Sequence, residues 1–361
     1  YANTFDTYNV TLVQNGSDKI GGSTVNATLS TEGLAVTLVF IDSTQGWLVT
    51  DNGTQDTAPT EKYVTATGGT ITCSGDYKIH SFTGPGTFCV SCAGNAGGSA
   101  TVDYLVVAGG GSGGSDYGGG GGAGGYRESP GTASGSYAVS PRGASPAVAL
   151  PVSVQGYTIT IGAGGAGRTA NGQQGLPGTP STFSTITSTA GGGGGTEGTP
   201  GPTTQIGLPG GSGGAGSYGP TAGGSGNTPP VSPAQGTDGG AGGAPLVGGG
   251  GGGAIAAGTA GSNPGTVSGP GGAGATSSIN GTPTARAGGG GGAGGGSPYG
   301  QGYTPGTGGS GGGGAGAPTC GGSGGDGTIN TGSGGGGGNL TTTCSGAGGS
   351  GIVIIRYKFQ N

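Results

Sequence analysis

The sequence predicts an all-β chain with packed polyglycine-II helices and essentially no α-helix. Of its 361 residues, 106 are glycine and only 6% are charged, whereas average globular chains have roughly 7% glycine and 25% charged residues. Only 14 of the glycines lie in residues 1–107, so a polar, β-rich part precedes a glycine-rich part. Between the glycine runs, apolar residues occur in short segments typical of strands, and none of these segments sustains a helical period of 3.6.

Residues 1–51 are predicted to form a small β module. The stretch VTLVQNGSDKIGGS contains Asn15-Gly16, a strong signal for a hairpin turn between apolar segments. A second apolar segment, Leu34–Val49, contains Trp47, the only tryptophan. The polar stretch 52–62 is interpreted as a linker to the rest of the chain.

Residues 63–107 are predicted to form a β-hairpin that leads into the glycine-rich part. Apolar and polar residues alternate around Tyr77 and Ile79, and a Gly84-Pro85-Gly86 turn follows, as expected between two strands. His80, the only histidine, has the opposite parity to Ile79. We therefore expect His80 to be a solvated or hydrogen-bonded structural residue and not a catalytic one.

Residues 108–361 are expected to form a sandwich of polyglycine-II helices framed by short strands. The β segments are 102–108, 157–163, 181–190, 276–287 and 351–359, and the last of them is expected to close the domain. STFSTITSTAGGGGG and TSSINGTPTARAGGGGG look like two copies of one unit. A strand that feeds a glycine run is therefore the predicted internal repeat.

Three other structures of the glycine runs are less consistent with the sequence. Collagen requires glycine at every third position, and the longer runs here keep no such register. Phosphate-binding loops require a lysine after the glycines or a helix that follows them, and no lysine lies between Lys78 and Lys358. A disordered linker is the usual interpretation of Gly/Ser-rich sequence, but linkers lack regularly interspersed apolar strands.

Packed polyglycine-II helices explain the runs best. Such a helix has three residues per turn and no internal hydrogen bonds, so its buried backbone groups must pair with neighbouring helices. Small residues should then recur every three positions on edges that face no neighbour. They recur in this way at Ser112/Ser115, Ala163/Ala166, Ser212/Ala215, Ala241/Ala244 and Ser323/Asp326. Because little side-chain area is available for a core, we expect association between chains to supply further burial.

The net charge and the distribution of cysteine, histidine and carboxylate side chains argue against several functions. The net charge is −5 without any run of Lys or Arg, which argues against nucleic-acid binding. No apolar stretch approaches 18 residues, so membrane insertion is not expected. Cys89-x-x-Cys92 has no second half-site, so a hairpin disulfide or simple packing is favoured over zinc, and no cofactor is expected. The carboxylates of the glycine-rich part are far apart in sequence, so we predict no catalytic residues.

The order of several segments resembles that of a known family. DYLVVAGGGSGG, YTITIGAGGAG, ARAGGGGGAGG and the closing GSGIVIIRYKF resemble the glycine-rich domain at the C-terminal ends of bacteriophage tail-fibre and virion proteins, especially those of marine phages. This resemblance covers residues 63–361. Through TLVQNGSDKIGG and VTLVFIDSTQGWLV, residues 1–51 resemble a second phage-fibre module. That module usually has an extra strand and an aspartate before the first motif, so we expect Tyr1 to be a truncated start.

The resemblance implies a virion-surface adhesin. Such fibres are commonly homotrimers, are joined to other virion proteins through the missing N-terminal part, and contact a host glycan or outer-membrane protein through loops at the tip. Tyrosine suits recognition because it offers contact area at low entropy cost. The candidate receptor contacts, in the loops between glycine runs, are Tyr117, Tyr126, Arg127, Tyr218, Tyr299 and Tyr303.

Two alternatives to this assignment stay open. The tyrosines could merely cap the edge of the glycine lattice, and Arg127 with Glu128 could form a solvated salt bridge. The whole protein could also be a purely structural virion component, such as a head fibre or decoration protein, without receptor binding.

Overall fold

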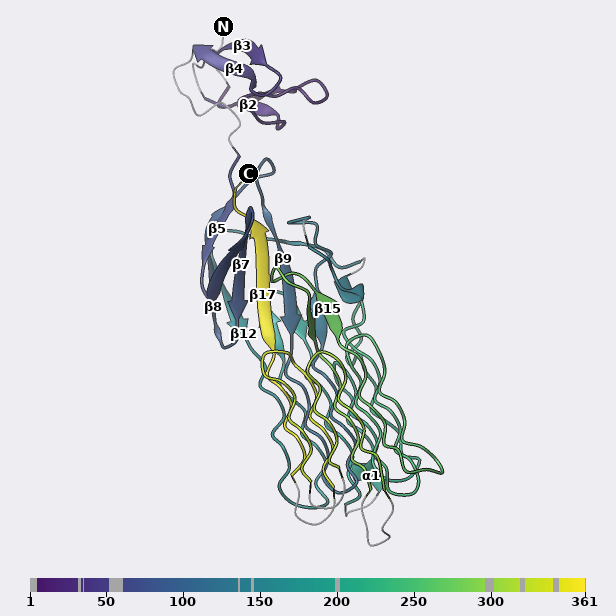
Figure 1. The fold of residues 1–361 in the computed structure, drawn as a ribbon. Coiled ribbons are helices and arrows are strands. Elements are labelled where there is room, and N and C mark those ends of the chain that lie inside the picture. The colour runs from purple at the N-terminus through teal and green to yellow at the C-terminus, as the bar shows by residue number, and fades with distance from the viewer. Residues whose placement is uncertain are drawn as a thin grey trace.

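The computed structural model describes residues 5–31, 34, 36–51, 61–135, 137–143, 146–198, 202–295, 302–318, 322–339 and 344–360. Its described elements are strands apart from two single helical turns, η2 (Pro141–Gly143) and α1 (Pro202–Gln205). The prediction of an all-β fold with essentially no α-helix is therefore confirmed. Figure 1 shows a small N-terminal unit, a β-sandwich and a bundle of extended segments that runs away from the sandwich. No described helix has the length and apolar character that crossing a membrane requires.

The N-terminal unit consists of two separate two-stranded sheets. They contain β1 (Val10–Leu12) paired with β2 (Ala27–Leu29), and β3 (Thr37–Asp42) paired with β4 (Gly46–Asp51), all antiparallel. The hairpin predicted around Asn15-Gly16 is wrong. The turn itself forms, since Asp18 N donates to Asn15 O at 3.1 Å. The chain after the turn pairs elsewhere, because Ile20 forms an isolated bridge with Trp47 and leaves β1 free to pair with β2.

Two antiparallel sheets form the sandwich, one in the order β10-β9-β17-β7-β6 with β11 beside β9, and the other in the order β14-β13-β12-β8-β5. Their strands are β5 (Val64–Thr67), β6 (Thr70–Ser74), β7 (Tyr77–Phe82), β8 (Gly86–Ala93), β9 (Thr101–Val107), β10 (Tyr126–Glu128), β11 (Leu150–Pro151), β12 (Gly156–Thr160), β13 (Ser181–Phe183), β14 (Ile186–Ser188) and β17 (Ile352–Lys358). Side chains of both sheets meet in one core, which contains the fully buried Phe88, Phe183 and Tyr357.

The predicted pairing of residues 63–107 is partly wrong. The strands on either side of Gly84-Pro85 are β7 and β8, and they belong to different sheets. The turn therefore carries the chain across the core, and β7 instead forms a hairpin with β6. His80 on β7 is buried in that core, where Nδ1 lies 2.7 Å from Gly68 O and Nε2 lies 3.0 Å from Tyr357 Oη. The hydrogen-bonded interpretation of His80 is thus confirmed, and the solvated one is wrong.

The glycine runs are extended segments, here called rods, and rod 118–125 shows how they pack. Every third amide of this rod donates to the same neighbour, so the donors cycle through three rods. The acceptors lie in rods 332–338, 189–195 and 249–252, and the carbonyls of rod 118–125 accept from rods 108–114, 212–215 and 290–293. Six neighbours and a three-residue cycle are the pattern of packed polyglycine-II helices.

Close backbone approach makes glycine necessary inside this lattice. A Cβ added to Gly120 would lie 2.1 Å from Gly290 O, and one added to Gly121 would lie 2.2 Å from Gly111 O. Both distances are well below van der Waals contact between carbon and oxygen. The lattice is therefore held by backbone hydrogen bonds between rods and not by interlocking side chains.

Small residues recur every three positions in the rods, but only some of these positions lie on exposed edges. Ala163/Ala166 and Ser323/Asp326 are exposed, as expected, whereas Ser112/Ser115 and Ser212/Ala215 are buried. The expectation is wrong for the buried pairs because serine hydroxyls can take part in the lattice. Leu176 N donates to Ser112 Oγ at 2.8 Å, and Ser212 Oγ donates to Gly253 O at 3.0 Å.

Short hairpins join the rods to the sandwich. Hairpin β13–β14 precedes rod 190–196, and the hairpin of β15 (Ala275–Ser277) and β16 (Thr284–Arg286) precedes rod 287–295. This agrees with the predicted repeat of a β unit that feeds a glycine run. The second hairpin covers the outer face of the β9–β17–β7 sheet, where Ile279 packs with Leu105 and Ile354 in a second core.

Candidate functional site

The rods end in a set of chain reversals that lies at the opposite end of the bundle from the sandwich. Figure 1 shows α1 at this end, whereas the N-terminal unit and the C-terminus lie on the sandwich side. We call this end the tip and define it by its described segments. They are residues 115–118, 168–173, 197–198, 202–206, 217–221, 244–247, 262–267 and 302–304.

Two of the predicted tyrosines meet at the tip. The rings of Tyr117 and Tyr218 lie 6.5 Å apart, centroid to centroid, with 42° between their planes. Tyr117 follows Asp116 in a turn where both residues have positive φ, 48° and 56°, which reverses the chain between two rods. Tyr117 is only 6% exposed, whereas Tyr218 is half-buried. The Tyr218 ring is therefore the accessible one of the two, and the buried Tyr117 ring packs against it.

An acidic pair lies beside these rings. Glu197 N donates to Asp116 O at 3.1 Å, which ties two reversals of the tip together. Burial raises the pKa of the Asp116 carboxyl, and burial together with the negative charge of Asp116 raises the pKa of Glu197. Two carboxyls alone do not hold a metal firmly, and no group of three or more His, Cys, Asp or Glu residues suited to a metal occurs among the described residues.

Apolar side chains of the tip were not anticipated from the sequence. Ile206, just after α1, is 43% exposed and Val267 is 49% exposed, whereas the predicted contact Tyr303 is only 8% exposed. Val267 bridges Thr304, which places two reversals next to each other. Since successive rods alternate in direction, counting rods from the strand 102–108 could have assigned these residues to one end of the bundle.

Tyr126 and Arg127 lie on β10 in the sandwich, so the structure separates them from the tip. Tyr126 is 1% exposed and its hydroxyl lies 3.2 Å from Glu128 Oε2, which it can reach as a donor. Its assignment as a receptor contact is wrong because the side chain is enclosed by the second core. Arg127 is half-buried and donates to Thr187 O at 3.4 Å. Tyr299 lies outside the described residues.

The expected alternative of a solvated Arg127–Glu128 salt bridge is also wrong. The two residues are adjacent on a strand, so their side chains point to opposite faces. The Glu128 carboxylate is buried and accepts hydrogen bonds from Ser140 N at 3.1 Å and from the hydroxyls of Ser140 and Ser277. Burial raises the pKa of Glu128, and these hydrogen bonds oppose the effect.

A second buried carboxylate binds the same loop. Asp103 Oδ1 accepts from Ser129 Oγ at 2.7 Å, and Oδ2 accepts from Ser134 N at 2.8 Å and from Ser134 Oγ at 2.6 Å. Together with Glu128, this carboxylate fastens the connection after β10 to the sheet. Its acceptor positions are occupied by the chain itself, so the arrangement is structural.

The sequence was compared with known proteins. The profile of a family described as a glycine-rich domain matches residues 82–358. Curated proteins yield no match. The matched range runs from the end of β7 to the end of β17, and so includes the rods and most of the sandwich.

Proposed function

The chain belongs to the glycine-rich domain family, and from the resemblance of its segments to phage-fibre sequences we propose that it is a bacteriophage virion fibre protein whose tip binds the surface of the host cell. In this proposal the glycine lattice is a stiff stalk, and the reversals of the tip carry the recognition surface. The protein works on the outside of the virion as a homotrimer and is joined to other virion proteins. It has no catalytic role.

One observation supports this proposal most strongly, the position of the tip relative to the chain ends. The chain enters the sandwich through β5 and leaves it through β17, on the same side of the molecule as the N-terminal unit (Figure 1). Any structure attached through the chain ends therefore leaves the tip exposed. Recognition loops on a rigid scaffold are the usual arrangement of binding proteins.

The composition of the tip favours recognition over simple capping. An accessible aromatic ring on Tyr218, the exposed Ile206 and Val267 and the acidic pair Asp116–Glu197 occur within one set of reversals. Aromatic and apolar anchors beside a few polar groups are typical of binding surfaces. If the tip only connected one rod to the next, short polar turns would be sufficient.

The alternative is a purely structural virion protein, and a specific observation favours it. Tyr117 and Tyr303 are 6% and 8% exposed, so these two rings cover the ends of rods as caps would. In that case the rod bundle serves as a decoration of the particle, and the tip contacts nothing.

Binding of the purified, fluorescently labelled chain to bacteria tests the proposal. A panel of marine bacterial strains is incubated with the chain, with Tyr218→Ala and with Tyr8→Ala, a matched control at a 73% exposed tyrosine of the N-terminal unit. We expect saturable binding to some strains that Tyr218→Ala weakens and Tyr8→Ala leaves unchanged. If no strain binds the chain, the structural alternative is correct. If Tyr218→Ala binds as the unmodified chain does, the assignment of recognition to Tyr218 at the tip is wrong.

A further inference from the structure

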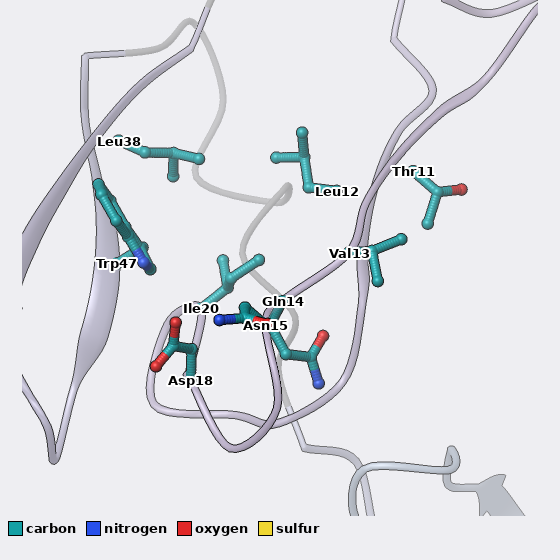
Figure 2. Close-up of a pocket in the computed structure, with 9 residues that line it drawn as sticks. All are labelled: Thr11, Leu12, Val13, Gln14, Asn15, Asp18, Ile20, Leu38 and Trp47. Carbon is teal, nitrogen blue, oxygen red and sulfur yellow. The ribbon is translucent and has the colours of Figure 1, made fainter.

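A pocket of about 470 Å³ opens between the two sheets of the N-terminal unit. Figure 2 shows Trp47 and Leu38 of the β3–β4 hairpin on one side and Leu12 of β1 on the other, with Ile20 between them. Ile20 is 5% exposed and forms the floor, whereas Trp47 is 40% exposed. The pocket volume falls within the range of small-molecule sites.

The aromatic wall of this pocket is held in place. Trp47 N donates to Lys19 O at 2.7 Å, and Gly21 N donates to Trp47 O at 2.9 Å. The Phe40 ring contacts the indole edge-to-face, with centroids 5.6 Å apart. A fixed and exposed indole offers an electron-rich face to polarised C–H groups.

Two hydrogen-bond acceptors that line the same pocket have no partner among the residues that the structure describes. Gln14 Oε1 is buried and accepts no hydrogen bond from these residues. The carboxylate of Asp18 is exposed and, within the described part of the chain, makes no hydrogen bond or ion pair. Asn15 adds an amide between them (Figure 2). A buried acceptor without a donor is costly, so an occupant that brings donors is favoured.

We propose that this pocket binds a neutral saccharide, with one apolar sugar face on Trp47 and sugar hydroxyls donating to Gln14 and Asp18. An acyl chain would cover the indole but bring no hydrogen-bond donor to Gln14 or Asp18. A phosphorylated ligand would place negative charge beside the Asp18 carboxylate. Only a ligand with an apolar face and several hydroxyl donors satisfies both parts of the lining. The proposal goes beyond the function of the tip and does not rest on it.

Trp47 is the only tryptophan of the chain, so its fluorescence reports on this pocket alone. The full chain is titrated with glucose, galactose, mannose and N-acetylglucosamine. We expect at least one sugar to change the tryptophan emission saturably. In Asp18→Asn the dissociation constant should rise at least severalfold, while Asp6→Asn, an exposed aspartate of the same unit that does not line the pocket, should bind as the unmodified chain does.

Three outcomes would overturn the proposal. The first is that none of the four sugars changes the emission up to its solubility limit. The second is that Asp18→Asn and Asp6→Asn bind the sugars equally well. The third is an emission change that follows protein concentration in the absence of sugar, which would assign the pocket to a second copy of the chain. Asp18 is exposed and not used by the fold, so its substitution is expected to leave the unit folded.

Discussion

Gly290 N donates to Gly121 O at 2.9 Å, although the two residues are 169 positions apart in sequence. This bond joins two rods, and Gly121 N in turn donates to Gly335 O of a third rod at 2.8 Å. Non-local backbone pairing of this kind replaces the side-chain core that the glycine-rich part lacks. Any added atom that holds two of these backbones apart should therefore destabilise the lattice.

Replacement of Gly121 by alanine tests this directly. The added Cβ would lie 2.2 Å from Gly111 O, and its other nearest atoms also belong to the backbone of Gly111 and Ser112. Because backbone atoms cannot turn aside as a side chain can, the two rods must move apart. We expect Gly121→Ala to lower the free energy of unfolding by about 2 kcal/mol or more, measured by urea denaturation. Gly84→Ala is the matched control, because its Cβ would meet nothing within 4 Å. Equal stability of the two variants would contradict the lattice.

The strands and the rods could be predicted from the sequence, but the strand pairing could not. Apolar segments such as 102–108 and 351–359 became β9 and β17 nearly residue for residue. Their neighbours depend on contacts that no local pattern encodes. The Gly84-Pro85 turn is compatible with a hairpin, yet β7 pairs with the distant β17, with Phe82 opposite Val353.

The placement of Tyr126 and Arg127 in the candidate site was wrong for a similar reason. Loops between glycine runs occur at both ends of the bundle, and their composition is alike at the two ends. Tyr126 and Tyr117 both flank the rod 118–125. One is enclosed beside the sandwich and the other lies at the tip, which only the direction of each rod decides.

His80 should make stability depend on pH in a narrow window. Burial lowers the pKa of His80, and the charge of Lys78 lowers it further, against the hydrogen bond to Gly68. The folded state thus binds the proton more weakly than the unfolded chain, in which histidine has a pKa of about 6.5. The contribution of His80 to stability should be fully present above a pH of about 6.5 and should be lost as the pH falls toward the lowered pKa of the folded state.

The effect of His80 can be isolated because it is the only histidine. Free energies of unfolding between about pH 7 and pH 5 should decline in the unmodified chain more steeply than in His80→Gln. The carboxyls of Asp116, Glu128 and Glu197 have raised pKa values and act in the opposite direction, but they are common to both proteins. Parallel pH profiles would show that His80 does not titrate differently on folding.

The buried Glu128 is expected to be important for stability and not for binding. Glu128→Ala leaves the hydroxyls of Ser140, Ser277 and Tyr126 without their acceptor. Loss of a buried acceptor costs about 1–3 kcal/mol, which thermal denaturation would show as a lower Tm. Glu128→Gln keeps one acceptor oxygen and should lose less. An unchanged Tm in Glu128→Ala would mean that these groups are satisfied elsewhere.

The four described cysteines should behave as free thiols. Cys73 and Cys89 are exposed and Cys92 and Cys344 are half-buried, and none of the four forms a disulfide in the structure. We expect a maleimide reagent to modify Cys73 and Cys89 in the native protein first, read out by peptide mass spectrometry. Addition of a reductant should leave the Tm unchanged. A Tm that falls on reduction would instead support the disulfide that the Cys89-x-x-Cys92 spacing suggested.

Amide hydrogen exchange distinguishes central rods from edge rods. In rod 118–125 successive amides donate to neighbouring rods without interruption. The edge rod 162–167 differs, because Gly165 N donates to Gly110 O at 2.9 Å, while Gly164 and Ala166 have no acceptor within the described chain. Exchange requires that a hydrogen bond first opens.

We therefore expect NMR to show slow exchange at every amide of rod 118–125, for example at Gly120 and Gly121, and slow exchange at only every third amide along the edge rod. Gly165 and Arg168 should exchange slowly, and Gly164, Ala166 and Gly167 should exchange fast. This contrast follows from three residues per turn, because an edge rod turns only some of its amides toward the lattice. A disordered linker would exchange fast at all of these positions, and a flat β-sheet would protect every second amide of its edge.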